Sequence, residues 1–348
     1  MKQKRANGRP QLQAVPPTEA IDLGVGGLSL CPRLKLLLSF FRSDASVRPV
    51  DEWKLKRALL DFLHDSIGLS VPEEDLAIHK LPDLNKRKRS EPVAAGALFI
   101  RDLDHLRRRG KGEQEEEDGE FPRRRFFEWR DSVVGKTDGI ELNIEGVKFR
   151  LTVEIPPSDD FDQLKKSWED FFSTQPLGTR YSSRGALRRP DTIVVAGVPS
   201  RWFAEPRVSS KPSMLVTHTI FSVLGKIRNL SVASDDASGK DEGSKGDLLS
   251  GLHCKAWVQF EDYSDFCAAT KVLCGRSMHK EGSRLKSDYE VSWDREGFFR
   301  ILEERTPRSH LEESSQTYQQ SLAGRLRREA PRVQSEATRI PKRFRRVD

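Results

Sequence analysis

The chain has 348 residues, a formal net charge of +7 and a charged fraction of 32%, while 36% of its residues are hydrophobic. This is long enough for two modest domains and polar enough to leave part of the chain without a packed core. Four cysteines without a CxxC pair exclude a disulfide framework and argue against zinc. No apolar run reaches the ~20 residues of a membrane helix. We expect a soluble, intracellular protein whose positive charge suits a polyanionic partner.

The first half of the chain predicts one domain behind a tail. Residues 1–29 are rich in Pro, Gly and Gln and are expected to be disordered. Residues 30–157 follow a βαββαβ order with a charged, solvated insertion at 104–125. The first helix is expected to bury Trp53 and Leu60 on one face. The strands are expected at 33–41, 75–81, 94–103 and 147–155, and the helices at 51–68 and 126–134.

A helix and linker at 158–189 connect this domain to a second one. The helix, at 160–175, carries Leu164 and Trp168 on one face and is expected to pack on a flanking domain. Residues 190–295 repeat the βαββαβ order more clearly, and residues 296–348 are expected to be mostly disordered. The second domain is predicted to have strands at 192–199, 226–234, 253–260 and 287–293, and helices at 212–225, with Leu215 facing inward, and at 262–273.

The third strand of the second domain is the octapeptide HCKAWVQF, His253 to Phe260, which alternates between an apolar and a polar face. Its polar face has one aromatic ring, Trp257, among cationic and hydrogen-bonding groups, as single-stranded RNA binding requires. The octapeptide approximates the third-strand pattern of an RNA-recognition motif. We therefore predict an α+β protein with two tandem ferredoxin-like (βαββαβ) domains of the RNA-recognition type and disordered tails.

The octapeptide also departs from that pattern. Lys255 replaces one stacking aromatic, and Val194 on the first strand replaces another. One base stack is worth about 1–3 kcal/mol, so RNA binding through Trp257 alone should be weak unless phosphate contacts assist it. The predicted RNA-binding residues are Trp257, Lys255, His253, Val194, Gln259 and Lys226.

Several segments are more specific than a general RNA-recognition motif: RPDTIVVAGVP, SRWFA at 200–204, KPS at 211–213, FSVLGKIRNLSV at 221–232, and AWVQFEDYSDFCAATKVLCGRSM at 256–278. Together with LCP at 30–32 and WEDFF at 168–172, they resemble the A-kinase anchor proteins that are also known as arginine/serine-rich splicing factors. The resemblance covers about residues 30–294. It implies a nuclear, speckle-associated regulator of alternative pre-mRNA splicing, with single-stranded RNA and splicing-factor proteins as partners. Trp202 and Phe203, within SRWFA, are expected to pack in the core.

Animal members of that family also anchor protein kinase A through amphipathic helices in a long charged region. That region is short here, and the apolar stripe at 297–308 is brief and limited by Pro307. We therefore do not expect binding of the kinase's regulatory subunit. The alternative function is a protein-interaction adaptor or scaffold on a degenerate RNA-recognition fold, because Val194 and Lys255 remove two stacking rings.

Two basic clusters are candidates for nuclear import. They are Lys86, Arg87, Lys88 and Arg89, and Lys342, Arg343, Arg345 and Arg346. Further basic runs occur at 107–109 and 123–125. The seven histidines are scattered, and no GxSxG, HExxH or P-loop spacing occurs. We expect a binding protein and not an enzyme, with no catalytic residue, metal site, cofactor or membrane partner.

Overall fold

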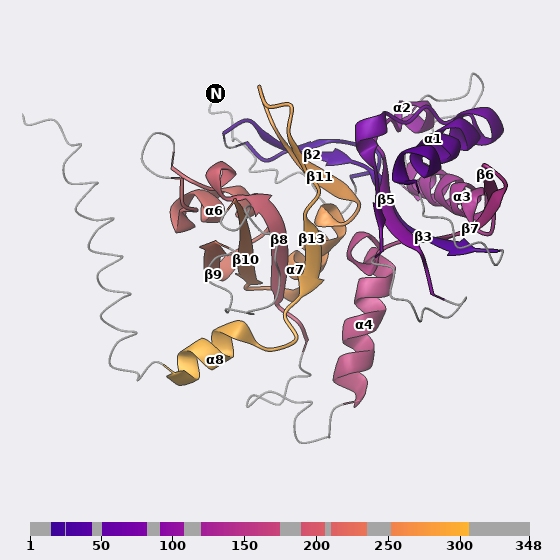
Figure 1. Ribbon diagram of the computed structural model, residues 1–348. Coiled ribbons are helices and arrows are strands. Elements are labelled where there is room, and N and C mark those ends of the chain that lie inside the picture. Colours follow the sequence, from indigo (N-terminus) through magenta and orange to yellow (C-terminus); the bar gives the residue numbers. More distant parts are fainter. Residues whose placement is uncertain are drawn as a thin grey trace, which may run out of the picture. The chain divides into compact units, whose positions relative to one another are not determined.

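The protein has a mixed α/β fold built on antiparallel sheets (Figure 1). It divides into two compact units, residues 1–295 and residues 296–348, and helix α8 (Phe298–Arg305) is the described element of the second unit. No helix within the described ranges is both long and apolar enough to cross a membrane. The computed structural model describes residues 15–24, 26–43, 51–81, 91–107, 120–174, 189–205, 210–234 and 252–305.

The first large sheet has the strand order β4-β5-β3-β7-β6. The predicted βαββαβ series is present, with β6 as an additional edge strand. One face of the sheet meets helices α1 and α3 over a core that includes Leu36, Phe40 and Leu151. The elements are β3 (Leu34–Arg42), α1 (Glu52–Phe62), β4 (Leu76–Lys80), β5 (Ala94–Ile100), α2 (Asp104–Arg107), α3 (Glu120–Thr137), β6 (Glu141–Ile144) and β7 (Val147–Glu154).

Helix α1 begins close to its predicted position, and a π-helical turn continues it to Gly68. The Asp51 carboxylate accepts hydrogen bonds from the backbone N–H groups of the first turn, at 3.1 and 3.3 Å, and Gly68 ends the helix in the left-handed region at φ 76°. Its predicted buried face is wrong in one respect, because Trp53 is 57% exposed. The buried residues are Leu55 and Leu59, which are four positions apart and so share a face.

The predicted insertion at 104–125 is wrong at both of its ends. Helix α2 lies at its beginning, and α3 starts at Glu120, before the helix predicted at 126–134. Helix α3 has no marked apolar pattern, and ion pairs and ring contacts stabilise it instead. Arg124 pairs with Glu128 one turn later at 3.6 Å, and the Arg130 guanidinium lies 4.7 Å from the centroid of the Phe127 ring.

The second large sheet has the strand order β13-β8-β10-β9. The chain visits it in the predicted βαββαβ series, and Trp202 and Phe203 are buried in its core as expected. Leu215 was expected to face inward, but it is exposed. The elements are β8 (Thr192–Pro199), α6 (Met214–Phe221), β9 (Ile227–Ser234), β10 (His253–Phe260), α7 (Tyr263–Leu273) and β13 (Glu290–Trp293).

Helix α4 (Phe161–Thr174) packs on the core of the second sheet, as the sequence predicts. The rings of Trp168 and Phe266 meet edge to face with centroids 5.3 Å apart. The indole N–H of Trp293 donates to the Ser167 hydroxyl at 2.9 Å. The connecting helix is therefore part of the second domain and not a spacer.

The expected disordered tail at 1–29 is wrong for its described end. Strands β1 (Ile21–Asp22) and β2 (Leu28–Pro32) form a hairpin that joins β11 (Arg276–Lys280) and β12 (Lys286–Ser287) in a sheet of order β1-β2-β11-β12 (Figure 1). Its leucines are buried in the core of the second domain. Because the partner strand lies some 250 residues later, no local pattern marks the hairpin as structured.

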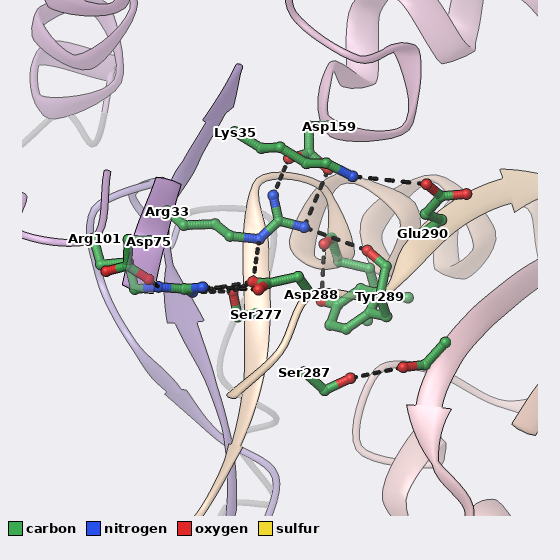
Figure 2. A network of polar contacts seen from close by, with 12 residues as sticks. Arg33, Lys35, Asp75, Arg101, Asp159, Ser277, Ser287, Asp288, Tyr289 and Glu290 are labelled. Atoms are coloured by element: carbon green, nitrogen blue, oxygen red, sulfur yellow. Dashed lines mark hydrogen bonds and ion pairs between the residues drawn. The ribbon is translucent and has the colours of Figure 1, made fainter. Parts of the chain in front are cut away.

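One residue separates β2 from β3, so the chain passes directly from the small sheet into the first large sheet. That residue, Arg33, is 1% exposed. Its guanidinium contacts Asp159, lies 3.2 Å from the Asp288 carboxylate, and donates to the Tyr289 carbonyl at 3.3 Å (Figure 2). Arg101 at the end of β5 adds a bidentate contact to Asp288 at 2.7 and 3.0 Å. A largely buried ion-pair network therefore links the first large sheet with the segment at Asp288 and Tyr289.

The two carboxylates of this network respond differently to burial. Burial raises the pKa of Asp159 above its ordinary value, although the Arg33 charge opposes the shift. Burial also acts to raise the pKa of Asp288, but hydrogen bonds from Arg101 and Ser277 outweigh it, and the pKa lies below its ordinary value. The network therefore favours the ionised form of Asp288, whereas burial works against the ionised form of Asp159.

Candidate nucleic-acid interface

Strand β10 has the alternation that its sequence predicts. Four of its side chains point into the core, and the other four are half-buried on the opposite face. That second face carries the predicted ring, Trp257. The buried set is Cys254, Ala256, Val258 and Phe260, and the half-buried set is His253, Lys255, Trp257 and Gln259.

Small side chains surround the Trp257 ring. Trp257 is paired with Val194 on β8 and with Ser231 on β9, and Val194 is paired with Ser292 on β13. Directly paired residues share a face of the sheet, so this row holds one large ring among short neighbours. Val194 is 7% exposed and offers a ligand little area. We call this row the platform; its one ring is the group on which a base would stack.

Lys255 lies beside the ring and not apart from it. Its Nζ is 4.9 Å from the centroid of the Trp257 ring, within the range of a cation–π contact. Such a contact is worth about 0.5–1 kcal/mol at an exposed site, whereas a base stack is worth about 1–3 kcal/mol. By these magnitudes, a base stacked on the ring would be favoured over the cation–π contact.

Gln259 is held at both of its amide atoms. The Asn229 amide donates to Gln259 Oε1 at 2.7 Å, and Gln259 Nε2 donates to the Asp191 carboxylate at 2.9 Å. The sequence prediction did not include Asn229 or Asp191, because it did not establish which residues β8 and β9 bring next to Gln259. The three side chains form a fixed polar row beside the platform, with amide groups that can contact a base edge.

His253 and Lys226 lie at opposite ends of this face. His253 opens β10 opposite Pro199, next to a register shift where Gly197 adopts φ 89°. Lys226 precedes β9, and its ammonium pairs with the Glu261 carboxylate. A phosphate contact by Lys226 would have to compete with that carboxylate. The predicted set therefore divides into a central group, His253 at one end and one paired cation at the other. The central group is Trp257, Lys255, Val194 and Gln259.

The two predicted import clusters, at 86–89 and 342–346, lie outside the described residues. The basic run at 123–125 lies on α3. Within the described part of the chain, no group of His, Cys, Asp and Glu side chains is arranged to hold a metal ion.

A four-stranded antiparallel sheet with a half-buried ring beside cationic and amide groups has the features of surfaces that stack single-stranded nucleic acid. The chain belongs to the family described as "AKAP-17A-like, RNA-binding domain", which residues 126–334 match. Human A-kinase anchor protein 17A is 27% identical over 161 residues, which are 44% of this chain and 21% of that protein. The family resemblance is thereby confirmed, and most of the length of that relative lies outside the match.

Proposed function

We propose that this chain is a non-enzymatic, RNA-binding nuclear protein that regulates pre-mRNA splicing, possessing two tandem ferredoxin-like domains of the RNA-recognition type. Membership of an RNA-binding family supports the choice of ligand. The strand orders β13-β8-β10-β9 and β4-β5-β3-β7 support the fold assignment. The similarity to an A-kinase anchor protein supports the nuclear, speckle-associated role and splicing-factor partners.

The proposed binding step is the stacking of one RNA base on Trp257. The Lys255 ammonium leaves the ring when the base arrives and turns to a backbone phosphate. The fixed amide row at Gln259 contacts the base edge, and His253 meets the strand beyond it. With a single stack and few phosphate contacts, affinity is expected to be modest. The carrying observation is the half-buried Trp257 ring in a row of short side chains.

The test compares the full chain with its Trp257→Ala variant. Binding of a fluorescein-labelled, single-stranded RNA 12-mer is followed by fluorescence anisotropy. Loss of one stack should weaken binding about 5- to 150-fold. Trp53→Ala is the matched control, because it removes an indole that is 57% exposed on α1 of the first domain. Equal affinities for the two variants would refute stacking on Trp257.

The second candidate function is a protein-interaction adaptor. The exposure of Trp53 favours it, since exposed tryptophans are frequent anchors of protein interfaces, and Trp53 lines a hollow of about 260 Å³ with Leu60 and Lys56. The salt dependence of the binding affinity distinguishes the two candidate functions. RNA affinity should fall steeply as salt is raised, whereas affinity for a protein through an apolar anchor should change little.

A further inference from the structure

A cavity of about 210 Å³ opens where the two domains of the first unit meet. Five distant segments form its walls: the N-terminal segment at 15–17, the start of β3, helix α3, the start of α4, and the end of α7. It lies on the helix side of the second sheet, since α7 packs on the face opposite Trp257. The cavity is therefore separate from the platform around Trp257.

Cationic side chains outnumber acidic ones in its lining. Six lysines and arginines face three aspartates. Two of the aspartates are already engaged, because Asp159 contacts Arg33 and Asp160 accepts from Arg130 at 3.1 Å. Figure 2 shows the Arg33 guanidinium turned toward the Asp159 carboxylate and the Lys35 ammonium turned toward Glu290. Three of the cations are also paired with carboxylates outside the lining: Arg33 with Asp288, Lys35 with Glu290 and Arg130 with Asp131. Arg123, Lys271 and Arg276 then face the Asp162 carboxylate in the lining, and this balance favours an anion. The cationic residues are Arg33, Lys35, Arg123, Arg130, Lys271 and Arg276.

Arg276 gives the cavity a buried charge whose hydrogen bonds go to carbonyl oxygens, while the Glu19 carboxylate acts on it electrostatically. Its side chain is 2% exposed, and it donates to carbonyl oxygens at Val272 (2.7 Å), Pro16 (2.8 Å) and Glu19 (3.3 Å). Burial lowers the pKa of this guanidinium. Carbonyls satisfy hydrogen bonds but carry no net charge, so an anion in the adjacent cavity would be stabilised by Arg276.

The walls also carry aromatic rings beside these cations. Two guanidinium groups approach the Phe127 ring, with Arg123 at 5.5 Å and Arg130 at 4.7 Å from its centroid. Phe161 lines the cavity at the start of α4. Rings for a base and cations for its phosphate are the combination found in single-stranded nucleic-acid sites. An acidic peptide would use the cations but has no aromatic base to place against the rings.

We propose that this junction cavity is a second RNA subsite that takes one nucleotide of a bound single strand, with its phosphate held by Arg123 and Lys271 at the rim. The proposal rests on RNA binding by the chain but not on stacking at Trp257. It adds a contact outside the sheet face and gives the first domain a direct part in binding. Residues 33 and 123 belong to that domain, so the subsite is incomplete without it.

The test uses the full chain and the same labelled RNA, with Arg123→Glu compared with Arg124→Glu. Both variants change the net charge by the same amount on the same helix, but Arg123 lines the cavity and the exposed Arg124 does not. Loss of a charge-assisted contact should make the Arg123→Glu affinity about tenfold lower than that of the control, with a salt slope reduced by about one. Lys271→Glu tests the opposite wall, and melting curves verify that each variant folds.

Equal affinity of Arg123→Glu and Arg124→Glu for RNA, with Lys271→Glu also unchanged, would overturn the subsite. If Trp257→Ala still weakens binding in that case, the proposed sheet-face function survives. If Arg123→Glu weakens RNA binding and Trp257→Ala does not, the subsite stands and the sheet-face mechanism is wrong. A poly-glutamate peptide, used as a competitor, tests the alternative occupant of the cavity, which is an acidic peptide. Arg123-dependent binding of that peptide without an effect on RNA would assign the cavity to a protein partner and overturn the proposal.

Discussion

We expect residues 189–295 not to fold as a separate fragment, because the N-terminal hairpin supplies part of their core. Deleting residues 1–32 removes Ile21, Leu23, Leu28 and Leu30, all buried against the second domain. At about 1.5–3 kcal/mol for each buried aliphatic side chain, their loss amounts to about 6–12 kcal/mol. A whole domain is stabilised by only about 5–15 kcal/mol. The deletion also takes away two of the three carbonyl partners of Arg276.

A point variant measures the same effect in a protein that still folds. Leu30→Ala in the full chain should lower the free energy of unfolding by about 2–5 kcal/mol, because it opens a cavity between β2 and the core. Leu252→Ala is the matched control, since Leu252 is 56% exposed just before β10, and should change stability by less than about 0.5 kcal/mol. Urea unfolding followed by circular dichroism gives both values.

Two results would refute this reasoning. One is cooperative melting of the fragment 189–295 at the Tm of the full chain. The other is a Leu30→Ala midpoint no lower than that of Leu252→Ala. Either would mean that the hairpin only covers a core that is complete without it. The hairpin would then contribute little to the free energy of unfolding, as the disordered-tail prediction implies, although it pairs with β11.

Three further outcomes are expected. The folded pKa of Asp288 lies below its unfolded value, so the stabilisation that its carboxylate provides is present above the unfolded pKa and is lost as pH falls through the folded pKa. Below about pH 4, the Tm of Asp288→Asn should therefore fall less than the Tm of the parent chain. Parallel curves of Tm against pH would contradict this. Lys255→Tyr restores a stacking ring and should tighten RNA binding about 5- to 150-fold by anisotropy, whereas unchanged affinity would mean that bases do not reach this face. Gly96→Ala would place a Cβ 2.2 Å from the Ala77 carbonyl oxygen and should lower the free energy of unfolding in urea by about 1–3 kcal/mol. The control Gly135→Ala, in open space on α3, should raise it by up to about 1 kcal/mol. Equal urea midpoints would show that β4 can move away from the added Cβ.

Local patterns were sufficient for most strands and helices. HCKAWVQF predicts both faces of β10 because side-chain direction alternates along any strand. The same reasoning failed at α1, where two apolar series overlap. Leu55 and Leu59 are buried, and Trp53 is exposed. Period alone does not say which of two apolar faces meets a sheet, since that depends on how the helix crosses it.

Long-range pairing explains what the sequence could not predict. Trp257 and Lys255 were identified from their own strand, but Asn229 and Asp191 join them only through the register of β9 and β8. The hairpin at 21–32 and the ion pairs of Arg33 involve partners more than a hundred residues away. Nothing near these residues in the sequence reports such partners. Binding sites assembled from distant segments, such as the junction cavity, are invisible for the same reason.

The match to the RNA-binding family begins at residue 126, inside α3 of the first domain. The core of the second large sheet nevertheless includes side chains from residues 21–30, and Asp288 is paired with Arg33 and Arg101. The small sheet joins the first large sheet through one residue, Arg33, and ion pairs connect both with Asp288. Under the proposed function, a strand that spans the Trp257 platform and the junction cavity would bind both with a high effective concentration, while a shorter strand would bind one. RNA affinity should therefore rise sharply at the strand length that first reaches both sites, and should change little at shorter or longer lengths. A smooth increase would indicate independent, non-specific phosphate contacts.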